Sequence, residues 1–172
     1  MGEPTTETIL IALGANLPSP RFGPPRATLE AALAAIEAAG VQVLKRSSWW
    51  ESEPVPASDQ PWYVNGVALV ATRLEPVLLL ALLHRIEAEF GRIRGVRNEA
   101  RLLDLDLLAY GDRRLAGPEP PLLPHPRLAD RAFVLLPLAE VAPDWRHPVT
   151  GEPVRQLIAR LAPGQKIRRI ED

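Results

Sequence analysis

The ten residues from Arg101 to Tyr110, RLLDLDLLAY, constrain the fold more than any other stretch of the chain. Side chains of a β-strand alternate between its two faces, so Asp104 and Asp106 are predicted to share one face and the neighbouring leucines the other. Two positions along a strand span about 6.6 Å, which lets both carboxylates reach a shared pair of hard cations. The run therefore predicts a strand with one core face and one face suited to magnesium that holds a polyphosphate.

The alternative is an amphipathic strand whose water-facing side carries Asp twice. Asp is depleted in strands, however, and two like charges on one face repel each other unless a cation or water screens them. Residues 91–101, GRIRGVRNEAR, contain four arginines and two glycines and show neither helical nor strand periodicity. Arginine binds phosphate oxygens in bidentate fashion and glycine lets a loop move, although an ordinary solvated basic loop has the same composition. Together, loop and strand predict guanidinium groups on one wall of a site and carboxylate-bound metal on the other.

The length of the chain and its composition limit the other possibilities. With 172 residues, 47% of them hydrophobic, we expect a single catalytic domain over residues 1–172, in which residues 1–7 form a disordered tail. The net charge of −1 argues against nucleic acid or an anionic membrane as a partner. The N-terminus lacks a signal-peptide pattern and the chain has no cysteine, so a cytoplasmic location is expected.

Hydrophobic periodicity and the positions of proline and glycine predict the secondary structure. Strands are expected over 8–13, 41–50, 63–72, 101–110 and 166–170, and helices between Pro25 and Gly40, between Pro76 and Gly91, over 131–141 and over 153–161. The first strand is apolar throughout and is predicted to be central in the sheet. The order of elements predicts an α+β fold with a ferredoxin-like core, in which a mainly antiparallel sheet is packed between helices.

Two further patterns are candidates for ligand contacts. Tyr63 and Asn65 share a face of the third predicted strand, where a ring can stack on a flat heterocycle and an amide can read its edge, unless the pair is simply a packed strand edge. His125 lies between two prolines and is either a phosphate contact or an exposed turn residue. The P-loop and Rossmann motifs are both missing, so a nucleotide would be held in another way.

Five motifs in the same order match one known family. These are Ala12-Leu13-Gly14-Ala15-Asn16, Asp59 to Asn65, Arg85-Ile86-Glu87 with Gly91 to Arg94, Arg101 to Asp106, and Pro124-His125-Pro126 through Arg131-Ala132-Phe133. From Ile9 to about Arg160 the chain resembles the 6-hydroxymethyl-7,8-dihydropterin pyrophosphokinases of folate biosynthesis.

The resemblance implies transfer of the β,γ-pyrophosphoryl group of ATP to the hydroxymethyl oxygen of the pterin, with release of AMP. It implies ATP as co-substrate and two Mg²⁺ ions held by Asp104 and Asp106. The expected partners are these small molecules, without nucleic acid or membrane, and a monomer is expected. By position, the pterin contacts would be Ser52, Val55, Tyr63, Asn65 and Phe133. The ATP contacts would be Glu87, Arg94, His125 and Arg131, and Arg92 and Arg101 would close over the phosphates.

The chain departs from the family pattern at two places. Asn98-Glu99-Ala100 stand where Trp-Gly-Pro is common, and His84 replaces a frequent glutamine, which puts details of ATP contact in doubt. Two rival functions stay open. A two-metal nucleotidyltransferase or nuclease would also use paired aspartates but needs a broad basic surface, and a non-catalytic α+β binding module would tolerate loss of either aspartate.

Overall fold

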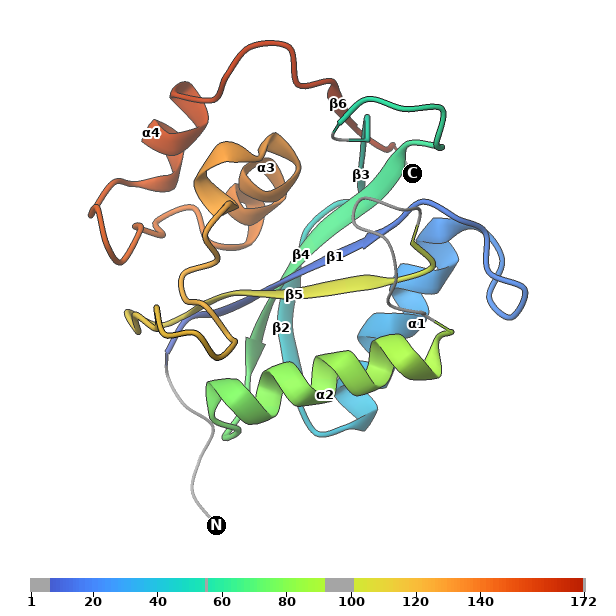
Figure 1. Cartoon of the computed structure of the whole chain (residues 1–172), viewed down its shortest axis with the longest axis horizontal. Coiled ribbons are helices and arrows are strands. Elements are labelled where there is room, and N and C mark those ends of the chain that lie inside the picture. The colour runs from blue at the N-terminus through green and yellow to red at the C-terminus, as the bar shows by residue number, and fades with distance from the viewer. Residues whose placement is uncertain (1–6, 55, 92–100, 172) are drawn as a thin grey trace.

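The computed structural model describes residues 7–54, 56–91 and 101–171 and has the predicted α+β architecture (Figure 1). The elements in chain order are β1 (Ile9–Ala15), α1 (Pro25–Ala38), β2 (Gln42–Arg46), β3 (Trp50–Ser52), β4 (Tyr63–Ala71), α2 (Pro76–Glu89), β5 (Asp104–Tyr110), a 3-10 turn (Leu128–Asp130), α3 (Ala132–Val141), α4 (Val154–Ala159) and β6 (Ile167–Arg169). None of the helices in this described part of the chain combines the length and apolar character needed to cross a membrane.

The sheet has the strand order β5-β1-β4-β3-β6, and β2 pairs separately with β4. Each pairing between these strands is antiparallel. β1 lies between β4 and β5 and its residues are almost all buried, which confirms that the first apolar run is a central strand. The predicted ferredoxin-like core with a mainly antiparallel sheet is therefore confirmed.

The prediction of one strand over residues 41–50 is wrong, because the chain forms two short strands there. β2 and β3 both pair with β4, and Ser47 lies between them. The Ser47 N–H donates to the carbonyl oxygen of Val67 at 2.9 Å, but the acceptor for the Val67 N–H is the Ser47 hydroxyl, at 3.0 Å, and not a main-chain carbonyl. The Trp49 ring then packs on Gly66, where a Cβ atom would lie 2.5 Å from the ring. A hydroxyl and a ring contact thus interrupt a stretch whose composition is typical of one strand.

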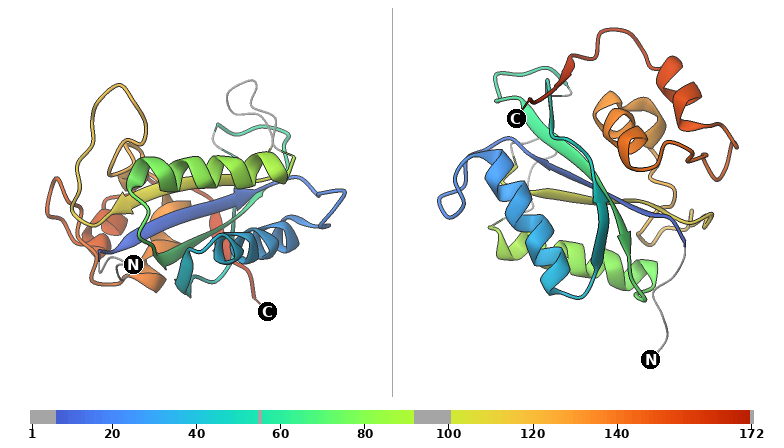
Figure 2. Two further views of the ribbon diagram at one scale, coloured as in Figure 1. Left: turned by 90° about the horizontal axis from the view of Figure 1, so that it is seen from below. Right: turned by 180° about the vertical axis from the view of Figure 1, so that it is seen from behind.

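The helices cover the two faces of the sheet with two separate apolar cores. α1 and α2 contribute Leu29, Ile36, Leu83 and similar side chains to the core that contains Ile9, Ile11, Leu13, Leu105 and Leu107. α3 and α4 form the other core with Leu10, Val67 and Leu108. Figure 2 shows α3 and α4 grouped together and apart from α1 and α2. The alternation of side chains along each strand therefore sorts residues between two different environments.

Both long helices begin and end as their sequences predict. α1 and α2 each carry proline in the first turn, where a missing N–H costs nothing. Gly40 and Gly91 follow their last turns with φ of +97° and +93°, a conformation that favours glycine. α3 is a helix despite Pro137 in its interior, as predicted for residues 131–141. The helical predictions are confirmed to within one or two residues for α1, α2 and α3.

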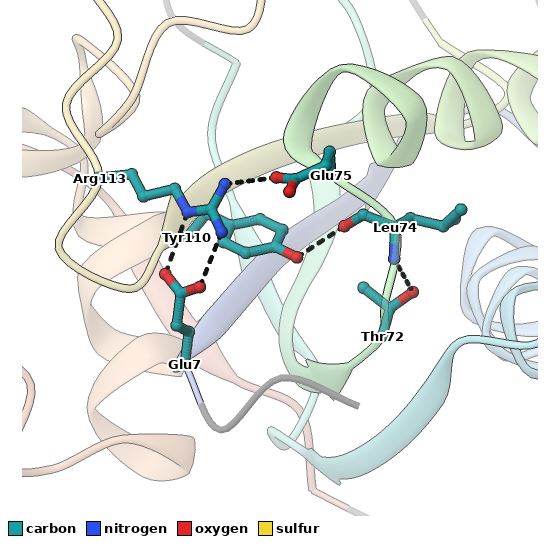
Figure 3. Close-up of polar contacts among 6 residues, drawn as sticks. All are labelled: Glu7, Thr72, Leu74, Glu75, Tyr110 and Arg113. Atoms are coloured by element: carbon teal, nitrogen blue, oxygen red, sulfur yellow. Dashed lines mark hydrogen bonds and ion pairs between the residues drawn. The ribbon is translucent and has the colours of Figure 1, made fainter. Parts of the chain in front are cut away.

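A polar cluster around Arg113 anchors the beginning of the chain to the body of the protein (Figure 3). The Arg113 guanidinium donates to both carboxylate oxygens of Glu7 and to Glu75, and it lies 4.6 Å from the centre of the Tyr110 ring. The Tyr110 hydroxyl donates to the carbonyl oxygen of Leu74 at 2.6 Å. Glu7 therefore belongs to the folded body and not to the tail expected over residues 1–7, while residues 1–6 lie outside the described part.

Candidate active site

The two aspartates of β5 lie on the face of the sheet opposite the α1 and α2 core. Leu103, Leu105 and Leu107 are buried, whereas Asp104 and Asp106 are partly exposed, as the alternation predicts. In the antiparallel register Asp104 lies opposite Gly14 and Asp106 opposite Ala12. These two partners are small, so the neighbouring strand leaves space beside both carboxylates.

That space is part of a cavity of about 480 Å³ that opens over β1, β4 and β5. Its floor includes Ala12, Gly14, Asp104 and Asp106, and its cationic side chains are Arg101, Arg127 and Arg131. Two aromatic side chains, Tyr63 and Phe133, line it as well, together with Ser52 and Asn65. Carboxylates, guanidinium groups and aromatic rings that are far apart in the sequence therefore meet around one volume.

The predicted heterocycle contacts come from three different elements. Asn65 on β4 is 5% exposed, and its Nδ2 donates to the hydroxyl of Ser52 on β3 at 2.7 Å. This bond fixes the orientation of the amide, and its Oδ1 lies so close to Gly14 that a Cβ there would be only 3.2 Å away. Tyr63 precedes Asn65 on the same face of β4, and Phe133 comes from the first turn of α3. Val55, the remaining predicted contact, lies outside the described residues.

The cationic wall combines predicted and unpredicted arginines. Arg101 and Arg131 were predicted, whereas Arg127 was not, and Arg92 and Arg94 lie outside the described residues. The Arg131 guanidinium lies 5.3 Å from the centre of the Phe133 ring. Burial lowers the pKa of Arg131, and the Asp106 carboxylate opposes that shift. A guanidinium that is partly stripped of water and close to two carboxylates is suited to bind phosphate oxygens.

His125 lies beside this cationic wall and is held by its main chain. Its N–H donates to the carbonyl oxygen of Leu108 at 2.8 Å, and its Nδ1 accepts from the N–H of Arg127 at 3.2 Å. Burial, together with the positive charge of Arg131, lowers the pKa of His125 to about 4. The imidazole is therefore neutral at pH 7, and since Nδ1 accepts, Nε2 carries the proton and can donate.

Glu87 lies on α2, on the other side of β5 from the cavity. It is 1% exposed, and its Oε2 accepts a hydrogen bond from the main-chain N–H of Leu105 at 2.7 Å. Leu105 stands between the two aspartates, so Glu87 holds the β5 backbone at the point where it presents them. Glu87 is not among the residues that line the cavity. Its predicted ATP contact stays a prediction, and its described role is to support the strand.

Asn16 joins two parts of the cavity wall, a role that was not predicted from the sequence. It is 1% exposed and follows β1 directly. Its Nδ2 donates to Gln60 Oε1 at 3.0 Å and to the carbonyl oxygen of Pro61 at 3.1 Å, and its Oδ1 accepts from the N–H of Arg101 at 2.8 Å. A buried amide needs several partners. A polar side chain directly after a fully apolar strand was the signal that could have indicated this.

The carboxylates fit a magnesium site that is completed by substrate. Among the described residues, no group of three or more His, Asp or Glu side chains is arranged to hold a metal ion. Mg²⁺ at a nucleotide site usually takes one or two protein carboxylates and obtains its other ligands from phosphates and water. Asp104 and Asp106 are such a pair, and the nearby arginines can bind the same phosphates. The fold and the cavity together suit an α+β enzyme for phosphoryl chemistry on a flat substrate.

Comparison with known proteins defines the family. The model of the 7,8-dihydro-6-hydroxymethylpterin-pyrophosphokinase (HPPK) family matches residues 10–143, and the chain belongs to this family. It is 41% identical to a 2-amino-4-hydroxy-6-hydroxymethyldihydropteridine pyrophosphokinase of Synechocystis over 153 residues. These residues are 88% of this chain and 75% of that protein. A protein of the same name from Pseudomonas aeruginosa is 40% identical over 165 residues, which are 95% of this chain and 97% of that one.

A solved structure supports the fold independently. The chain superposes on the crystal structure of Plasmodium falciparum HPPK-DHPS wild type with SDX-DHP with a TM-score of 0.70, over 93% of this chain and 45% of that one, at 15% identity. At this identity the likeness concerns the fold alone. The family assignment confirms pyrophosphoryl transfer in folate biosynthesis, with ATP as co-substrate, and nothing in the comparisons favours a nuclease or nucleotidyltransferase.

Proposed function

We propose that the cavity over β1, β4 and β5 is the active site, in which the β,γ-pyrophosphoryl group of ATP moves to the hydroxymethyl oxygen of 6-hydroxymethyl-7,8-dihydropterin and AMP is released. The observation that carries this proposal is that Asp104, Asp106 and three arginines share one cavity with Tyr63, Asn65 and Phe133. The first group suits a polyphosphate and the second suits a flat heterocycle. The cavity therefore has residues suited to each of the two substrates.

The pterin half of the site is the region around Asn65. In the proposal the pterin ring lies between Tyr63 and Phe133, and the Asn65 amide binds the polar edge of the ring. The bond from Asn65 to Ser52 orients that amide before substrate arrives, which reduces the entropy lost on binding. The main chain after Ser52 lines the same side of the cavity, and Val55 stays a predicted contact.

The phosphate half is the region around the aspartates and arginines. We propose that Asp104 and Asp106 hold two Mg²⁺ ions, which would neutralise the phosphate charge. Arg101 and Arg131 bind phosphate oxygens, and neutral His125 donates a hydrogen bond to the nucleotide through Nε2. Arg92, Arg94 and Glu87 stay predicted contacts of ATP. No protein nucleophile is needed, because positioning and charge neutralisation supply most of the acceleration in phosphoryl transfer.

The protein acts in this proposal as one catalytic domain, a monomer in the cytoplasm whose partners are small molecules. The decisive experiment supplies ATP, Mg²⁺ and 6-hydroxymethyl-7,8-dihydropterin and resolves the nucleotide products by chromatography. AMP should form in step with the pterin diphosphate and only when Mg²⁺ is present. Formation of ADP, or of AMP without pterin, would show that the protein does not catalyse pyrophosphoryl transfer to the pterin. Full activity in excess chelator would show that the reaction needs no metal ion.

A further inference from the structure

The segment that follows α4 reaches the active site from outside the region matched by the family model, residues 10–143. β6 pairs with β3, so that Ile167 lies opposite Ser52, and the N–H of Glu53 donates to the carbonyl oxygen of Lys166 at 3.1 Å. These pairings bring the residue before Lys166, Gln165, close to the beginning of α3. The C-terminal segment is therefore part of the frame around the proposed pterin pocket.

The Gln165 side chain makes two hydrogen bonds to the main chain at the start of α3. Its Oε1 accepts from the N–H of Ala132 at 2.8 Å, and its Nε2 donates to the carbonyl oxygen of Asp130 at 3.0 Å. The two bonds are on either side of Arg131, and Phe133 lies two residues after Arg131. One amide thus holds the backbone on both sides of a residue that lines the active-site cavity.

This contact satisfies an N–H group in the first turn of α3. The first N–H groups of an α-helix have no partner within the helix, and a side chain of the residue before it usually supplies one. Arg131 occupies that position in α3 and its side chain makes no such bond. Gln165 therefore supplies, from 33 residues away along the chain, the acceptor that local sequence does not provide.

A second cavity explains why the anchor matters for Phe133. This cavity, of about 270 Å³, is lined by Phe133 and Gln165 and by residues of the loop after β3, and Phe133 also lines the active-site cavity. Phe133 thus borders two cavities and packs only in part against the core formed by α3 and α4. Because neighbouring side chains enclose the ring only in part, its position depends on the backbone of the first turn of α3. That backbone is the part that Gln165 holds.

We propose that Gln165 is a positioning residue that fixes Arg131 and Phe133 for substrate binding. The inference rests on the proposed roles of these two residues in the active site. Gln165 touches neither substrate in this proposal, and its effect is to keep a guanidinium and a ring in the geometry that the substrates need. Small displacements of such groups weaken binding even where the fold is retained.

The test uses the full chain with Gln165→Leu, which removes both bonds at similar volume, and Gln156→Leu as the matched control. Gln156 lies on α4, is exposed, and its side-chain amide donates to the Glu152 carboxylate at 3.3 Å, far from α3's first turn in the sequence. Gln165→Leu should raise KM for both pterin and ATP about 5- to 10-fold and lower kcat less than this. Amide exchange at Ala132 should accelerate in the same variant, and Gln156→Leu should change none of these quantities.

Gln165→Glu tests the hydrogen bond to Asp130 separately from the one to Ala132. It also provides the test of the proposal if Gln165→Leu fails to fold. A glutamate keeps an acceptor for the Ala132 N–H but cannot donate to Asp130, so its KM values should lie between those of wild type and Gln165→Leu. Unchanged KM values in both variants would overturn the inference, as would a rise in KM without faster exchange at Ala132.

Phe133→Ala distinguishes failure of this inference from failure of the proposed site. The proposed site requires that Phe133→Ala raise KM for the pterin at least about tenfold, because a stacking ring is lost. If it does so while Gln165→Leu changes nothing, only the role of Gln165 is refuted. If Phe133→Ala leaves KM unchanged, the pterin site itself is misplaced.

Discussion

The two faces of the sheet use neighbouring residues of the same strands for different purposes. On one face Ile9, Ile11 and Leu13 of β1 are buried under two 14-residue helices, α1 and α2. On the other face Leu10 is buried under α3 and α4, whereas Gly14 lines the active-site cavity. α3 and α4 are shorter, with 10 and 6 residues, and leave part of their face to the cavity. The covered face supplies most of the apolar burial, and the partly covered face is available for chemistry.

The comparison predicts that substitutions on the two faces have different consequences. A change on the open face should alter turnover with little effect on stability. A change one residue away, on the covered face, should do the reverse. The largest effect expected is on the open face, because charge neutralisation at a phosphate transition state depends on few groups.

Asp104→Asn and Asp106→Asn should each remove most of the activity and leave the fold intact. Each replaces a charged ligand for a hard cation with a neutral one, so the barrier should rise by about 3 to 4 kcal/mol, or a few hundredfold in kcat. Steady-state kinetics at saturating Mg²⁺ and circular dichroism measure the two effects. Asp112→Asn, in the exposed turn after β5, is the matched control and should keep wild-type kcat. Near-normal turnover in either aspartate variant would show that the metal ions bind elsewhere.

Leu107→Ala tests the covered face next to Asp106. Leu107 is buried in the core with α1 and α2, so the free energy of unfolding should fall by about 2 to 4 kcal/mol. The kcat of the folded protein should stay within a few-fold of wild type, because the side chain points away from the cavity. Urea denaturation and kinetics below the transition separate stability from turnover. The control is Leu44→Ala on β2, where the leucine is 49% exposed and little stability should be lost. A loss of activity as large as in the aspartate variants would contradict the division between faces.

Asn16→Leu tests the junction at the edge of the open face. It removes the amide that joins Arg101 to Gln60 and Pro61, so kcat/KM should fall about tenfold and the free energy of unfolding by about 1 to 2 kcal/mol. Asn16→Asp keeps the acceptor for the Arg101 N–H and should recover part of the activity. If the aspartate and leucine variants are equally impaired, the contact with Arg101 is not the one that matters.

The smallest predicted effect is a pH dependence of stability that comes from His125. Its folded-state pKa of about 4 lies below the ordinary histidine pKa of 6.5, so the unfolded chain binds the proton first as the pH falls. The stabilising contribution of neutral His125 is complete above about pH 6.5 and is lost towards pH 4. Because the ring is only partly buried, we expect about 1 to 2 kcal/mol over this range. Urea denaturation of wild type and His125→Gln from pH 4 to 7 should show a shallower dependence in the variant, and parallel curves would refute the assignment.

Short-range patterns predicted the elements that position the proposed metal ligands. The alternation in β5 placed Asp104 and Asp106 on one face, and proline and glycine marked the ends of α1 and α2. These predictions succeeded because strand alternation and helix termini depend on a few neighbouring residues, whose chemistry is visible in the sequence. The same reasoning failed over residues 41–50, where Ser47 and Trp49 meet β4 and divide the strand in two.

The sequence by itself determined which residues alternate, where the helices begin and end, and which family motifs occur in order. Only the tertiary structure decided which side chains meet around the cavity. Asn16 contacts Arg101 across 85 positions and Gln165 contacts Ala132 across 33, and neither pair has a local pattern that announces it. The physical reason is that such contacts depend on how the whole sheet and its helices pack, whereas alternation is a property of each strand alone.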